Sequence, residues 1–169
     1  MPVVLYRIDD RLIHGQVVVG WGRPLDLAFV VLVNDEVAES EWEQELYRMA
    51  APPEMDVHFA TVADAARRHA EFRADPRPGM VLTGDVPTMR ALVDAVAAAD
   101  PAGAVRAVNL GGLHHRPGRA QRMRYVFADA DEERELRALA AAGVQVTAQD
   151  VPSARPVPLA DVLSGRADG

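Results

Sequence analysis

The stretch LAFVVLV, residues 27–33, is an uninterrupted run of apolar side chains with the length of a β-strand. A strand with one face in water alternates apolar and polar residues, whereas a parallel strand covered on both faces is apolar throughout. Asn34 and Asp35 follow as a turn or as the cap of a helix. The stretch therefore predicts a buried strand inside a parallel sheet.

Apolar runs and helical patterns alternate on both sides of this strand. Further strands are predicted over residues 3–8, 56–60, 79–83, 105–110, 123–127 and 144–147. Helices are predicted over residues 15–21, 36–51, 62–73, 86–99, 131–142 and 159–163. Such alternation builds βαβ units, so we expect an α/β fold: a doubly wound, mainly parallel open sheet with helices on both faces. Residues 111–118 leave little room for a helix, so one antiparallel strand is expected near residues 123–127.

The length of the chain, 169 residues, suits one hydrophobic core. No linker or repeat divides it, so we expect a single domain over residues 1–169, with 164–169 as a frayed tail. No segment approaches the roughly 20 apolar residues that span a bilayer, and the N-terminus lacks the order of a signal peptide. A cytoplasmic protein without direct membrane insertion is expected.

Composition excludes several kinds of chemistry. The chain has no Cys, so a disulfide framework, a thiolate nucleophile and a Cys-based zinc site are impossible. All 18 basic residues are Arg, which excludes a phosphate-loop Lys and a Schiff-base Lys. The formal net charge is −7, whereas a nucleic-acid-binding domain shows a basic face. No nucleic-acid partner is expected.

The loop RIDDRLIHGQV, residues 7–17, joins the first predicted strand to the first predicted helix. In open parallel sheets, reactive groups collect at the carboxyl ends of the strands, where this loop lies. An imidazole such as that of His14 is a nucleophile near neutral pH, and Arg11 is suited to meeting phosphate oxygens bidentately. A carboxylate beside a dianionic phosphate would repel it, so Asp9 or Asp10 is assigned to orienting His14 and Arg11.

The helix start in this loop favours phosphate binding. Gly15 lets backbone N–H groups, including that of Gln16, approach phosphate oxygens. These observations predict a phosphohistidine site on His14. From spacing alone, the alternative of a solvated turn with His14 at a helix start is equally consistent with the residues.

Further strings occur along the chain in a recognisable order. They are Trp21, Val33-Asn34-Asp35, Ala51-Pro52, Val108-Asn109-Leu110-Gly111-Gly112 and Gln149-Asp150-Val151-Pro152. Together with the loop at 7–17, they make the chain resemble the IIB components of the mannose/fructose/sorbose family of the bacterial phosphoenolpyruvate-dependent sugar phosphotransferase system. The resemblance covers about residues 2 to 163.

The resemblance implies a phosphotransferase without a cofactor. A IIA phosphohistidine would phosphorylate His14 on Nδ1, and the group would pass to a sugar bound by a membrane IIC/IID component. Arg11 would stabilise the phosphoryl group, Asp10 would orient the site, and Gly15 and Gln16 would bind phosphate. A regulatory phosphocarrier without sugar transfer is the alternative, and neighbouring IIC and IID genes would discriminate between them. A nucleotide-binding domain is disfavoured because G-x-G-x-x-G and a phosphate-loop Lys are both missing.

The stretch after residue 112 is rich in Arg and His. Arg116 and Arg119, with Arg122 and Arg124, form either a solvated loop or a rim that docks an acidic partner. His114 and His115 could suggest a metal site with His58 or His69. Adjacent histidines in an extended loop point apart, however, and no carboxylate spacing completes a ligand set, so no metal is expected.

One further loop and the two tryptophans have structural explanations. Thr83-Gly84-Asp85 follows a strand and precedes a helix, so Asp85 is expected to cap that helix rather than to form part of a phosphate pocket. Trp21 and Trp42 are both expected to pack in the core or at its edge.

Overall fold

The computed structural model describes residues 2–166 and contains a seven-stranded sheet in the order β3-β2-β4-β1-β5-β8-β9. Pairing is parallel from β3 to β8, and β9 pairs antiparallel to β8. The strands are β1 (Val3–Ile8), β2 (Phe29–Val33), β3 (Asp56–Ala60), β4 (Gly79–Thr83), β5 (Ala107–Leu110), β8 (Gln145–Ala148) and β9 (Val157–Pro158). The predicted mainly parallel, open α/β sheet is confirmed.

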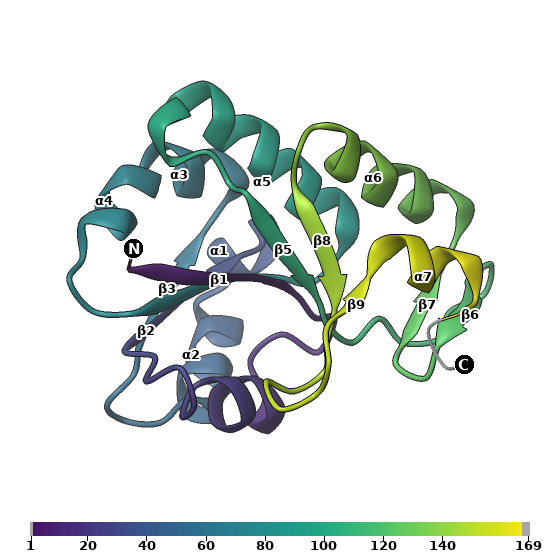
Figure 1. Ribbon diagram of the computed structural model, residues 1–169. Coiled ribbons are helices and arrows are strands. Elements are labelled where there is room, and N and C mark those ends of the chain that lie inside the picture. The colour runs from purple at the N-terminus through teal and green to yellow at the C-terminus, as the bar shows by residue number, and fades with distance from the viewer. Residues whose placement is uncertain (1, 167–169) are drawn as a thin grey trace.

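Helices cover both faces of the sheet (Figure 1). They are η1 (Gln16–Trp21, one π-helical segment), α1 (Asp35–Ala38), α2 (Glu41–Ala50), α3 (Val62–Arg67), α4 (His69–Ala74), α5 (Val86–Ala99), the 3-10 turn η2 (Pro101–Gly103), α6 (Ala130–Ala141) and α7 (Leu159–Ser164). One apolar cluster joins side chains of η1 to β2 and β4, and a second joins α3, α5, α6 and α7 to the opposite face. The sheet is therefore the middle layer between two cores.

β2 shows why an apolar run predicts a central strand. All five of its residues are buried, and β3 and β4 flank it on the two sides. Its side chains divide between the two cores, Val30 and Leu32 on one face and Val31 and Val33 on the other. A polar side chain on either face would be buried without a partner, which costs free energy.

Two predicted helices are each divided in two. The predicted helix over 36–51 is broken before Ser40, whose Oγ accepts a hydrogen bond from the Glu43 amide and begins α2. The predicted helix over 62–73 is broken at Arg68, between α3 and α4. The prediction that Trp42 packs in the core or at its edge is wrong: it lies on the outer face of α2 and is 72% exposed.

The segment near 123–127 is antiparallel, as expected, but it is a hairpin rather than one strand. β6 (Ala120–Met123) pairs with β7 (Val126–Ala128), and the two form a separate small sheet beside α7 (Figure 1). A place in the main sheet beside β5 is not free, because β1 and β8 occupy both of its edges. The antiparallel strand of the main sheet is instead β9.

The register places the ends of three strands together. Ile8 at the end of β1 is level with Thr83 of β4 and Leu110 of β5. β1 is the strand from which the chain winds first toward β2 and later toward β5, so this edge is a topological switch point. In open α/β sheets, ligands bind at such a point.

Candidate active site

The loop after β1 is held between its two neighbouring strands. The Asp9 amide donates to the Thr83 carbonyl at 2.9 Å, and the Asp10 amide donates to the Gly112 carbonyl at 2.9 Å. Leu12 then turns the chain with a left-handed φ of 59°, a strained conformation for a branched residue. Leu12 and Ile13 are buried, whereas Arg11 is exposed and His14 is partly exposed. The turn thus places the two predicted phosphate-handling groups on the outer side of the loop.

His14 stands against the carboxylate of Asp9. Its Nε2 atom lies 3.3 Å from Asp9 Oδ1, in ion-pair range, although Nε2 is not aligned for a hydrogen bond with any residue from 2 to 166. The imidazole side chain is 20% exposed and the Asp9 side chain is fully buried. The Nδ1 atom has no hydrogen-bond partner within the described part of the chain. The ring therefore turns Nε2 inward and leaves Nδ1 free.

Asp9 is kept as a carboxylate by its neighbours. Burial acts to raise its pKa, but the contact with His14, the charge of Arg7 and the amide of Arg11 together hold the pKa below its ordinary value. The Arg11 amide donates to Asp9 Oδ1 at 3.1 Å, and Arg7 Nη2 donates to Oδ2 at 3.1 Å. The Asp9 carboxylate faces Nε2 of His14 and favours a proton on that nitrogen.

Arg7 lies behind the His14 loop, and sequence reasoning assigned it no role. Its side chain is fully buried, and burial lowers its pKa, opposed by Asp9. It donates to Asn109 Oδ1 and to the carbonyls of Gln149 (2.8 Å) and Asp150 (3.3 Å). The sequence does carry a signal for Arg7, because a charged residue in an otherwise apolar strand is unusual.

The carbonyl of Asp150 is the common anchor of this network. It also accepts hydrogen bonds from Trp21 Nε1 at 2.8 Å and from Gln16 Nε2 at 3.0 Å. The Arg7 guanidinium lies over the Trp21 ring, 4.9 Å from its centroid. Trp21 is buried, as predicted. The last loop of the sheet therefore fixes both η1 and the buried arginine behind the site.

Arg11 and Gln16 contact each other near the carboxylate that faces His14, and Gly15 follows His14 in the chain. Arg11 Nη2 donates to Gln16 Oε1 at 2.8 Å, and Arg11 Nε lies 3.9 Å from Asp9 Oδ1. Gly15 has an ordinary helical φ of −52°, and a Cβ placed on it would meet nothing within 4 Å. Neither backbone conformation nor packing within residues 2–166 requires a glycine there, so the open space is available to a ligand.

The assignment of Asp10 to the orientation of His14 is corrected by the geometry, since the carboxylate beside His14 is that of Asp9. Asp10 faces the other way, toward the loop after β5. Its Oδ1 lies 2.5 Å from His114 Nδ1, and its Oδ2 accepts from the His114 amide at 2.7 Å. Consecutive residues at a strand end point in opposite directions, so the two aspartates face different partners.

Arg119 does not fit the proposed docking rim. Its side chain is 5% exposed, makes a double hydrogen bond to Glu132 and donates to the His114 carbonyl. Arg116 is exposed and remains a candidate. The alternative raised for Asp85 is resolved: its carboxylate caps α5 by accepting from the Thr88 amide at 2.7 Å.

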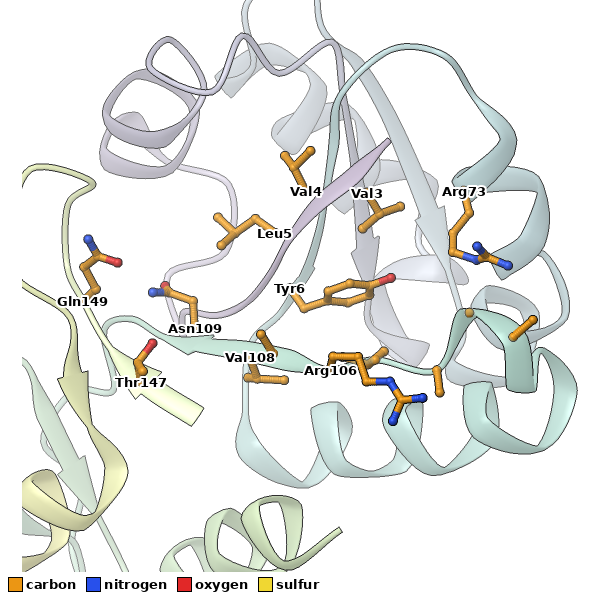
Figure 2. Close-up of a pocket in the computed structure, with 15 residues that line it drawn as sticks. Val3, Val4, Leu5, Tyr6, Arg73, Arg106, Val108, Asn109, Thr147 and Gln149 are labelled. Carbon is orange, nitrogen blue, oxygen red and sulfur yellow. The ribbon is translucent and has the colours of Figure 1, made fainter. Parts of the chain in front are cut away.

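A cleft of about 440 Å³ opens elsewhere, between β1 and β5 (Figure 2). These strands pair only at Arg7–Asn109 and Ile8–Leu110 and diverge before that point. Leu5, Tyr6 and Thr147 line the cleft, and of the described residues none from the loop 9–16 does. No cluster of metal-ligating side chains occurs among residues 2–166, and no helix in that part could cross a membrane. The His14 loop is the candidate active site.

Comparison with known proteins places the chain in a family. The family model described as PTS system sorbose subfamily IIB component matches residues 3–168. The chain belongs to this family. The sorbose-specific EIIB component of Klebsiella pneumoniae is 30% identical over 165 residues, covering 97% of this chain and 96% of that protein. The N-acetylgalactosamine-specific enzyme IIB component 2 of Escherichia coli is 33% identical over 164 residues, covering 96% of this chain and all of that protein.

Solved structures agree with this placement. The IIB domain of the sorbose permease from Klebsiella pneumoniae superposes with a TM-score of 0.84 at 28% identity, covering 97% of each chain. The mannose-specific EIIAB component of Escherichia coli is 28% identical over 165 residues, and the chain spans only 49% of its length. The chain is therefore a sorbose-type IIB component of a phosphotransferase system with the fold of its family.

Proposed function

We propose that this IIB component accepts a phosphoryl group on Nδ1 of His14 and passes it on to a sugar during uptake. One observation carries the choice of atom: Asp9 faces Nε2 at 3.3 Å, while Nδ1 has no hydrogen-bond partner within residues 2–166. A carboxylate this close to Nε2 favours the tautomer with its proton on Nε2 and its lone pair on Nδ1, which is then the nucleophilic atom. The geometry thus supports the nitrogen that the family resemblance implies.

The transfer itself requires positioning and charge stabilisation. The N–P bond of a IIA phosphohistidine breaks as the bond to Nδ1 forms, and the electron pair returns to the donor imidazole. The His14 ring becomes cationic, and the Asp9 carboxylate behind Nε2 stabilises that charge. Arg11 is hydrogen-bonded to Gln16 and lies 3.9 Å from the Asp9 carboxylate that faces His14. Its guanidinium is suited to binding the phosphoryl oxygens, and the open space at Gly15 admits them.

The partners follow from the same chemistry. The phosphodonor is a IIA protein, and the acceptor is a sugar hydroxyl presented by a membrane IIC/IID component. The relatives are named for sorbose, N-acetylgalactosamine and mannose, so the substrate class is a hexose or a hexose derivative. The site sits at the edge of a cytoplasmic carrier, and the sugar itself is selected by the membrane component.

The test is phosphate transfer from a phosphorylated IIA protein of a sorbose-type system. The purified wild-type chain should acquire acid-labile phosphate, and mapping should locate it on His14 Nδ1. His14→Ala should remain folded and should fail to pass phosphate to sugar in membranes that contain IIC and IID. Sugar phosphorylation by this variant at the wild-type rate would overturn the proposal. Phosphorylation of His14 without any sugar transfer would favour the regulatory phosphocarrier.

A further inference from the structure

Two consecutive aspartates that follow β1 each face one histidine, and the ring nitrogen that they face differs. Asp9 faces Nε2 of His14, and Asp10 faces Nδ1 of His114. The proposed function uses only the first pair. The second pair is built by residues 104 positions apart in the chain, in the loop that follows β5.

Further hydrogen bonds and an ion pair hold the Asp10–His114 pair in place. Asp10 binds both the ring and the backbone amide of His114, and its side chain is 5% exposed. Arg119 donates to the His114 carbonyl at 2.8 Å and lies 3.7 Å from Asp10 Oδ2. The double hydrogen bond from Arg119 to Glu132 fixes that guanidinium. A carboxylate that is itself held in place fixes the tautomer and the orientation of the imidazole.

The free nitrogen of His114 faces outward. The side chain is 53% exposed, and Nε2 makes no hydrogen bond to any residue from 2 to 166. With the Nδ1 proton engaged by Asp10, the lone pair is on Nε2. His14 also turns one nitrogen toward a carboxylate, but that nitrogen is Nε2 and it makes no hydrogen bond to Asp9.

The His114 ring and the Asp9 carboxylate border a common space at Gly112. A Cβ placed on Gly112 would lie 3.3 Å from Cε1 of His114 and 3.5 Å from Oδ1 of Asp9. Asp9 Oδ1 is the atom that contacts His14. The glycine therefore keeps an opening between the His114 ring and the carboxylate of the first pair, on the same edge of the sheet.

We propose that His114 is a second phosphoryl acceptor, which takes the group on Nε2. The donor is a phosphoramidate, either a protein phosphohistidine or a small N–P compound. The donor N–P bond breaks as the Nε2–P bond forms, and the electron pair stays on the leaving nitrogen. The His114 ring keeps its Nδ1 proton and becomes cationic, and the adjacent Asp10 carboxylate stabilises it. The inference goes beyond the proposed function and does not require His14 to be active.

The test uses phosphoramidate as the donor and the full chain as the acceptor. His14→Ala should take up one acid-labile phosphate, located on His114 Nε2 by peptide mapping and by nitrogen-15 NMR. His14→Ala/His114→Ala should take up none. His115→Ala is the matched control, because His115 is exposed beside Phe127, with a ring-centroid distance of 5.6 Å and no carboxylate partner in the described residues. It should be labelled like the wild type.

The Asp10→Asn variant tests whether His114 is labelled because Asp10 activates its ring or only because the ring is exposed. It should slow labelling of His114 by roughly tenfold, because a hydrogen bond to a charged group is lost, while labelling of His14 persists. Circular dichroism establishes that the variant is folded. If folded His14→Ala carries no phosphate, or carries it equally on His115, the proposal fails. If the wild type is labelled on His114 but not on His14, the proposed function is overturned and the proposal for His114 stands.

Discussion

Asp9 Oδ1 lies 3.3 Å from Nε2 of His14, while the other oxygen of the same carboxylate accepts a hydrogen bond from the buried Arg7. One carboxylate therefore connects the reactive ring to the interior of the sheet. The Arg7–Asp9 pair is fully buried on both sides. Removing one partner of a buried pair leaves an uncompensated charge, which is more damaging than the pair is stabilising.

Asp9→Asn is expected to lower both stability and phosphotransfer. The free energy of unfolding should fall by about 3–5 kcal/mol, because the Arg7 charge loses its partner. Labelling of His14 should also slow, because the neutral amide no longer stabilises the ring cation. Asp10→Asn, one residue away, is the control and should leave His14 labelling near normal. Denaturant unfolding and donor kinetics measure the two effects, and a fully stable Asp9→Asn with wild-type labelling would refute the assigned role.

Tyr6 is expected to make stability depend on alkaline pH. Its hydroxyl lies 2.7 Å from His69 Nε2, and His69 Nδ1 lies 2.9 Å from Asp100 Oδ2. Burial raises the pKa of Tyr6 to about 12, with Arg73 lowering it and Asp100 raising it. The fold thus favours the neutral phenol. The contribution is complete below the unfolded pKa of about 10 and is lost as the pH rises from about 10 to about 12.

The loss amounts to on the order of 2–3 kcal/mol over that range. Tyr6→Phe cannot ionise, so its free energy of unfolding should show a correspondingly smaller decline with pH, although it starts lower because the hydrogen bond to His69 is gone. Urea unfolding across this range compares the two proteins. Parallel pH curves would mean that Tyr6 titrates alike in the folded and unfolded chains.

Gly15→Ala should separate folding from function. The added Cβ meets no atom within 4 Å and the φ of −52° suits any residue, so stability should stay the same or rise by about 0.5–1 kcal/mol. Phosphotransfer should slow, because the methyl group enters the space reserved for phosphoryl oxygens. Gly79→Ala is the contrast: its Cβ would overlap the Phe29 ring and destabilise the protein. Unchanged transfer by Gly15→Ala would show that the space is not used.

The two tryptophans should respond differently to truncation. Trp21 is buried, donates to the Asp150 carbonyl and stacks on Arg7, so Trp21→Ala should cost about 3–5 kcal/mol. Trp42 is 72% exposed, so Trp42→Ala should change the free energy of unfolding by no more than about 0.5 kcal/mol. Thermal unfolding measures both. A large loss of stability in Trp42→Ala would contradict its placement on the outer face of α2.

Local patterns predicted much of this fold, because local signals fix its elements. The apolar runs at 3–8, 56–60 and 79–83 coincide with β1, β3 and β4, and the Asp85 cap and Pro87 fix the start of α5. The hairpin of β6 and β7 was read as one strand, since its turn at Arg124 and Tyr125 carries no Gly, Asn or Pro. The break before α2 is marked by the local Ser40 cap, which the periodicity of apolar residues does not show.

The candidate site also combines residues that are neighbours in sequence with contacts between distant parts of the chain. His14, Arg11, Gly15 and Gln16 are neighbours in sequence, so the loop pattern sufficed to bring them together. The contact of Asp10 with His114 and that of Arg7 with Gln149 span 104 and 142 residues. Such contacts depend on the order of strands in the sheet, which a pattern of alternation does not determine. The choice between Asp9 and Asp10 likewise depends on which way each side chain points at the strand end.

The last prediction concerns docking by Arg116. A double substitution of Arg116 and Arg119 would confuse two effects, because Arg119 is buried against Glu132 and Asp10 and its loss would leave carboxylates unpaired. Arg116 is exposed in the loop that also carries His114, so Arg116→Ala should leave stability unchanged within about 0.5 kcal/mol.

A positive charge there would steer an acidic phosphodonor toward His14, and steering acts on the association rate and is screened by salt. Transfer from the IIA protein should therefore slow by about two- to tenfold at low ionic strength, with the deficit shrinking at high salt. Labelling by phosphoramidate should not change, since a small donor needs no docking surface. Equal rates for Arg116→Ala and wild type with the protein donor at low salt would show that the loop is only a solvated connection.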